Sequence, residues 1–188
     1  MQHYSMTAAE LDALVALFYP DPSLLGEFQW IHQDALPPLS RKLLAHDQHM
    51  TVTVESFHRD EVDVEALAIN NADSSQYRRK IVLRRRRDRQ PVLFGIVRMD
   101  LTVMEPSVAD EIRQLGKPLG SILIAHNVLR SVELVALWEV VAGNDLAEIL
   151  NVAAGTVLFG RTARIYCNGE PAIELLEIVT SDDSPKTN

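Results

Sequence analysis

Residues 160–179 read GRTARIYCNGEPAIELLEIV, and this stretch decides the fold. Two runs of alternating character lie on either side of Asn168-Gly169, a dipeptide typical of a two-residue type I′ turn. The stretch therefore predicts an antiparallel β-hairpin. Other strands that are joined by short turns would extend the same sheet in the same antiparallel sense.

Similar patterns recur upstream of this hairpin. Further strands are predicted over residues 50–57, 61–70, 77–83, 92–102 and 131–141. Helices are predicted from the capping-box spacing at 7–10, after Pro37-Pro38, and over 106–115 and 144–150. This order of elements predicts an α+β fold, with a single antiparallel β-sheet and helices covering one face. We expect residues 1–180 to form one domain and residues 181–188 to form a disordered tail.

The composition is that of an acidic globular chain. It has 188 residues, a formal net charge of -8 and a pI near 5.2. Affinity for DNA or RNA depends on excess positive charge, so nucleic acid is not the expected main partner. Cys167 is the only cysteine, and there is neither a signal-peptide pattern nor an apolar run long enough to span a bilayer. These features predict a cytoplasmic protein with no membrane partner, and they predict nothing about its oligomeric state.

The stretch YRRKIVLRRRRD at residues 77–88 places six arginines close together in this acidic chain. Alternate side chains of a strand share a face, so Arg79 falls in an otherwise apolar row with Tyr77 and Ile81. Arg84–Arg87 instead lie in or beside a hairpin loop, where their charges would be solvated. A buried guanidinium keeps its charge and needs an anionic partner. That partner is either an internal carboxylate or the carboxylate of a ligand, which a guanidinium can bind through two parallel hydrogen bonds.

The last strand supplies the other candidate group, a carboxylate. Glu174 and Glu177 lie on opposite faces of this strand, and each is the lone acid in an apolar row. Alternation therefore cannot choose between them. The chosen acid could transfer a proton to or from a ligand, or it could be the internal partner of Arg79.

Metal binding is not expected from the histidines. His46 and His49 have a spacing that could serve a metal, and His58 follows, but structural or surface histidines are far commoner than ligands. Cys167 beside the Asn-Gly turn is interpreted as a small strand residue rather than a nucleophile.

Four stretches together resemble the chorismate–pyruvate lyase family in their order and approximate spacing. They are HMT at 49–51, YRRKIVL at 77–83, GKPLGSIL at 116–123 and LFGRTARIYCNGEPAIELLEIV at 158–179. In that family, an arginine early in a strand, a Pro-Leu-Gly turn and a glutamate in the last strand form the site. The resemblance covers roughly residues 36–179, and it implies a chorismate-lyase-like fold.

The resemblance also implies an activity and a set of site residues. Arg79 would bind the ring carboxylate, Leu119 would contribute backbone groups, Met50 would line the cavity and Glu177 would contact the ring oxygen. The implied enzyme removes pyruvate from chorismate to leave 4-hydroxybenzoate, with Arg79 and Glu177 as its catalytic residues and without metal or cofactor. Glu174 remains the alternative acid.

Two other functions stay open at this point. The same fold also serves as a non-catalytic domain that binds small molecules, so the chain could bind an aromatic acid without changing it. It could also be a lyase that acts on a related enolpyruvyl acid.

Overall fold

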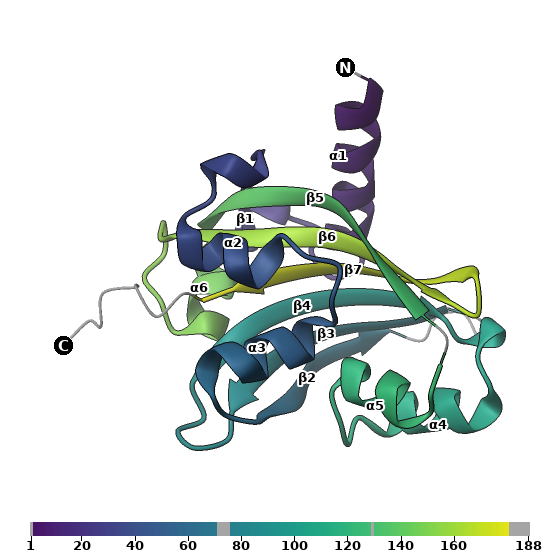
Figure 1. The fold of residues 1–188 in the computed structure, drawn as a ribbon. Helices are drawn as coiled ribbons and strands as arrows, with labels where there is room; N and C mark the ends of the chain where they lie inside the picture. The colour runs from purple at the N-terminus through teal and green to yellow at the C-terminus, as the bar shows by residue number, and fades with distance from the viewer. Residues whose placement is uncertain (1, 71–75, 129, 181–188) are drawn as a thin grey trace.

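The computed structural model describes residues 2–70, 76–128 and 130–180. Within these residues, seven strands form one antiparallel sheet in the order β1-β5-β6-β7-β4-β3-β2 (Figure 1). The strands are β1 (Gly26–Trp30), β2 (Val62–Asn70), β3 (Gln76–Arg85), β4 (Pro91–Asp100), β5 (Arg130–Ala142), β6 (Val157–Cys167) and β7 (Glu170–Val179). The expected α+β class with a single antiparallel sheet is confirmed.

The predicted final hairpin is the β6–β7 pair. Asn168 and Gly169 both have positive φ, at 55° and 88°, as a type I′ turn requires. Strand β7 then pairs with β4 on its other side, so it lies at the centre of the sheet. The hairpin thus joins the β1-β5-β6 half of the sheet to the β4-β3-β2 half.

Helices lie on both faces of the sheet. The α-helices are α1 (Gln2–Val15), α2 (Pro38–Leu44), α3 (Met50–His58), α4 (Pro106–Gln114), α5 (Leu119–Ala125) and α6 (Asn144–Leu150). Helices α2 to α5 pack on the face that carries Ile81 and Val97, and Figure 1 shows α2 and α3 in front of the strands. Helices α1 and α6 pack against Val82 and Phe94 on the opposite face, which adds a layer that the sequence did not predict.

Residues 50–57 do not form the predicted strand, because they belong to helix α3. The alternating Thr and Val residues gave the strand signal, but intrinsic β-propensity is weak against tertiary packing. The buried residues of this helix, Met50, Thr51, Val54 and His58, recur at helical spacing and turn one side of α3 inward.

The start of the first helix also differs from the prediction. Helix α1 begins at Gln2, so residues 7–10 lie inside it and do not form its N-terminal cap. The predicted disordered tail at 181–188 lies outside the described residues, and the division into one domain over residues 1–180 stays a prediction. Over the part of the chain that the structure describes, no helix is long and apolar enough to cross a membrane.

Candidate functional site

A cavity lies between the β-sheet and the starts of helices α3 and α5. Its empty volume is about 580 Å³, counting the part that opens to solvent. Apolar side chains such as Leu93 and Leu175 form most of its wall. The four residues chosen from the sequence, Arg79, Leu119, Met50 and Glu177, all line this cavity. Their roles toward a ligand stay predictions.

Arg79 is almost completely enclosed, with an exposed fraction of 2%. Its Nε and Nη1 atoms are buried and have no hydrogen-bond partner, and among the described residues no carboxylate lies within ion-pair distance of it. Burial lowers the pKa of Arg79, and the nearby hydroxyl of Tyr77 partly offsets that effect. The internal carboxylate partner that the sequence left open is therefore not found in the described part of the chain.

Glu177 lies in the cavity, paired with an arginine that the sequence analysis missed. Arg161 donates from Nε to Oε2 of Glu177 at 2.7 Å, and the side chains of the two residues have exposed fractions of 2% and 13%. Arg161 also donates from Nη1 to the backbone oxygen of His46 at 2.9 Å. The signal that marked Arg79 was present here too, because Arg161 is the lone cation in a strand row with Ala163 and Ile165.

The structure separates the two candidate glutamates. Glu174 lies on the opposite face of β7, where Arg98 donates from Nε to its Oε2 at 2.6 Å. This pair is partly exposed and does not line the cavity. Of the two acids, only Glu177 reaches the cavity that holds Arg79.

Two helix starts face the same space. Helix α3 begins at Met50 and helix α5 at Leu119, and neither N-cap residue, His49 or Pro118, makes a side-chain capping hydrogen bond. The first N–H groups of a helix have no partner within the helix, and they carry partial positive charge. Gly120 allows this arrangement, because a Cβ atom at its position would lie 3.1 Å from Oγ1 of Thr51.

The surroundings of the histidines near the cavity favour the neutral imidazole over the charged form. Burial and the charges of Arg130 and Arg161 lower the pKa of His49 to about 4. Burial, with a further contribution from Arg161, also lowers the pKa of His46. In the ranges that the structure covers, no three His, Cys, Asp or Glu side chains lie close enough together to hold a metal ion.

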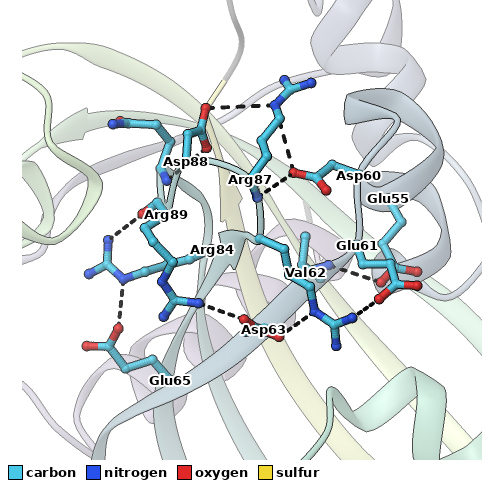
Figure 2. Close-up of polar contacts among 12 residues, drawn as sticks. Glu55, Asp60, Glu61, Val62, Asp63, Glu65, Arg84, Arg87, Asp88 and Arg89 are labelled. Atoms are coloured by element: carbon cyan, nitrogen blue, oxygen red, sulfur yellow. Dashed lines mark hydrogen bonds and ion pairs between the residues drawn. The ribbon is translucent and has the colours of Figure 1, made fainter.

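Arg84–Arg87 and Arg89 lie at the far end of β3 and in the β3–β4 loop, and all five are paired with acids; Figure 2 labels Arg84, Arg87 and Arg89. Strand β2 and the turn before it supply most of these acids. The pairs are Arg84–Glu65 at 2.7 Å, Arg85–Asp88 at 2.9 Å, Arg86–Asp63 at 2.9 Å, Arg87–Asp60 at 3.8 Å and Arg89–Asp63 at 2.6 Å, and Arg86 also contacts Glu61. The positive charge of these five arginines is therefore balanced locally.

Comparison with solved structures places the fold in the chorismate-lyase-like class. PhnF from Mycobacterium smegmatis superposes with a TM-score of 0.50 and 11% identity, over 71% of this chain and 64% of PhnF. A protein described as the ligand-binding domain of a GntR-family transcriptional regulator from Bordetella bronchiseptica gives a TM-score of 0.48 and 16% identity, over 64% of this chain and 86% of that chain. The C-terminal domain of the histidine utilization repressor from Pseudomonas syringae gives 0.45 and 14%, over 68% and 96%.

These comparisons correct the prediction of an enzyme. Searches of protein-family models and of curated proteins find no match, so no match to a sequence family supports a lyase. The similar solved structures include ligand-binding domains of transcriptional regulators, and none of those named above is a lyase. The assignment as a chorismate–pyruvate lyase is therefore wrong, and the resemblance that suggested it holds at the level of the fold.

Proposed function

We propose that this chain binds a small aromatic acid in the cavity and does not transform it. The observation that carries the proposal is Arg79, a cation with an exposed fraction of 2% that lines the cavity and has two buried N–H-bearing atoms without partners. A buried, unpaired charge costs several kcal/mol, and a bound carboxylate would supply the missing anion.

The carboxylate end of the ligand would lie between Arg79 and the start of helix α3. The first backbone N–H groups of helix α3, at Met50, carry partial positive charge. The first N–H groups of helix α5, at Leu119, carry it as well. The ligand anion would thus meet one full charge and the uncapped start of helix α3; the sequence resemblance assigned carboxylate binding to Arg79, backbone groups to Leu119 and a lining role to Met50.

The far end of the ligand would reach Glu177. Arg79 pairs with Val97 on β4, whereas Glu177 pairs with Gly95, so the two residues are two strands apart and offset by two positions. Ordinary strand spacing and rise put their Cα atoms about 12 Å apart. Between them, the side chain of Ile81 packs over Gly95, at 3.3 Å from where a Cβ atom of residue 95 would lie, and a flat ring would lie along this apolar floor of the cavity.

Calorimetric titration with benzoate, 4-hydroxybenzoate and uncharged benzamide tests this proposal. Benzoate and 4-hydroxybenzoate should bind and be recovered unchanged, and benzamide should bind far more weakly. Arg79→Met should weaken binding of both acids by about 3 kcal/mol, because charge-assisted hydrogen bonds are lost. Arg98→Met removes a cation from the opposite face and is the matched control. Equal binding of benzamide and benzoate, or full affinity in Arg79→Met, would refute the proposal.

A further inference from the structure

We infer that Arg161 determines which acids the site accepts, by holding Glu177 as a fixed hydrogen-bond acceptor at the end of the cavity away from Arg79. The site would then select monocarboxylic acids that carry a hydroxyl or amino donor at their far end. The inference rests on the proposed function, because it assumes that the carboxylate of the ligand lies at Arg79.

The contacts of Arg161 fix the position of its guanidinium. The side chain lines the cavity with an exposed fraction of 2%, and Nε donates to Oε2 of Glu177 at 2.7 Å. On the other side, Nη1 donates to the backbone oxygen of His46 at 2.9 Å. A buried guanidinium that is held at two points leaves its carboxylate partner little freedom to turn.

This pairing decides what Glu177 can offer to a ligand. A carboxylate in an ion pair only accepts hydrogen bonds. Its Oε2 is used by Arg161, and across the described ranges its Oε1 accepts no hydrogen bond. A ligand group that meets Oε1 must therefore donate a proton, as a phenol or an aniline does. A second carboxylate at this position would meet a like charge in a poorly solvated place.

The net charge of the side chains that line the cavity also favours a monocarboxylic acid. Arg79 and Arg161 contribute two positive charges and Glu177 one negative charge, which leaves one positive charge for a ligand. A monoanion balances it, and a dianion does not.

Arg161 also acts on the other end of the site. His46 lies in the segment that joins α2 to α3, so the hydrogen bond from Arg161 holds the chain four residues before Met50 and the start of α3. One side chain therefore fixes both the far acceptor and the segment that leads to the proposed carboxylate subsite.

The test compares the affinities of 4-hydroxybenzoate, benzoate and benzene-1,4-dicarboxylate in the full chain. Wild-type protein should bind 4-hydroxybenzoate on the order of tenfold more tightly than benzoate, as expected for a hydrogen bond to a charged acceptor. It should bind benzene-1,4-dicarboxylate at least about tenfold more weakly than benzoate. In Arg161→Met, both ratios should fall to about threefold or less, because Glu177 is no longer held as a paired carboxylate.

The ratios separate this role from a purely structural one. A variant that only disturbs the fold weakens all three acids together and leaves their ratios unchanged. Arg161→Lys keeps the positive charge but loses the planar set of guanidinium donors, so it should keep part of the preference for 4-hydroxybenzoate over benzoate. If Arg161→Met does not fold, the double variant Arg161→Met with Glu177→Gln removes the pair as a unit, and it should bind benzoate and 4-hydroxybenzoate about equally.

Three results would overturn the inference. A wild-type protein that binds benzoate and 4-hydroxybenzoate equally would refute it and leave the proposed function standing. Unchanged ratios in Arg161→Met or in the double variant would refute it as well. A wild-type protein that binds none of the three acids would refute the proposed function and this inference together.

Discussion

The two ends of strand β3 carry the same type of residue in opposite situations. Toward its end and in the following loop, Arg84, Arg86 and Arg89 each have a carboxylate within 3 Å, and much of this cluster is open to solvent. Near its start, Arg79 is enclosed and has no carboxylate partner among the described residues. Both ends of the strand are rich in arginine, so residue type does not distinguish them. What distinguishes a surface cluster from a candidate binding group is whether the arginine is buried and whether a carboxylate lies near it.

The energetics of the two ends differ for the same reason. An exposed ion pair contributes little to folding, because water already solvates both charges well. A buried cation without an anion instead reduces the stability of the ligand-free fold, and a ligand that binds only the folded state restores that stability. Substitutions at the buried charges should therefore change the free energy of unfolding more than substitutions in the exposed cluster.

The largest effect is expected where a buried pair is broken. Glu177→Gln leaves Arg161 without its counter-charge and should lower the free energy of unfolding by about 3 kcal/mol. Glu174→Gln is the matched control, since it removes the partly exposed partner of Arg98 on the same strand and should cost less than about 1 kcal/mol. Urea unfolding of the two variants measures the difference. Equal losses would show that the two faces of β7 do not differ in the way the structure indicates.

A smaller effect of opposite sign is expected at Arg79. Arg79→Met removes the unpaired buried charge and should raise the free energy of unfolding of the ligand-free protein by about 2 kcal/mol. Adding 4-hydroxybenzoate should stabilise wild-type protein by RT ln(1 + [L]/Kd), where [L] is the free acid concentration, and should stabilise the variant far less. Thermal unfolding with and without the acid measures both effects. A variant that is less stable than wild type without ligand would mean that Arg79 has a favourable internal partner.

The sequence predicts those parts of the site that are marked by a pattern within one strand, and not those that depend on a neighbouring strand. Arg79 could be identified because a lone cation in an apolar strand row is a local pattern, and Arg161 carries the same pattern. The choice between Glu174 and Glu177 could not be made locally, because each is the lone acid of its row. It is decided by their partners Arg98 and Arg161, which come from the neighbouring strands β4 and β6.

The secondary structure of helix α3 could not be predicted from its local sequence pattern. Its residues alternate Thr and Val, which favours a strand, yet the same residues place Met50, Val54 and His58 on one side of a helix. Packing against α2, α5 and the sheet selects the helix, and that packing involves residues distant in sequence. The helix matters for the site, because Met50 lines the cavity and the first N–H groups of a helix have no partner within it.

An intermediate effect is expected from His49, which lines the cavity and is close to Arg130 and Arg161. Its pKa is about 4 in the folded protein because of burial and the charges of Arg130 and Arg161, against about 6.5 in an unfolded chain. Between these values the unfolded state binds more protons, so stability should fall as the pH is lowered from about 6.5 toward 4. The loss at pH 5 relative to pH 7 should be on the order of 1–2 kcal/mol. His49→Gln should lose less over the same interval, and parallel pH profiles of the two proteins would contradict the assignment.

The smallest effect is expected in the β3–β4 loop. Arg86 contacts both Glu61 and Asp63, but its side chain has an exposed fraction of 57%, so water and salt screen these contacts. Arg86→Ala should change the free energy of unfolding by less than about 1 kcal/mol, and the difference from wild type should shrink further in 0.5 M NaCl, where the Debye length is only about 4 Å. Affinity for 4-hydroxybenzoate should be unchanged, because the cluster lies outside the cavity. A salt-independent loss of more than about 2 kcal/mol would show that the cluster has buried character, and the contrast between the two ends of β3 would then fail.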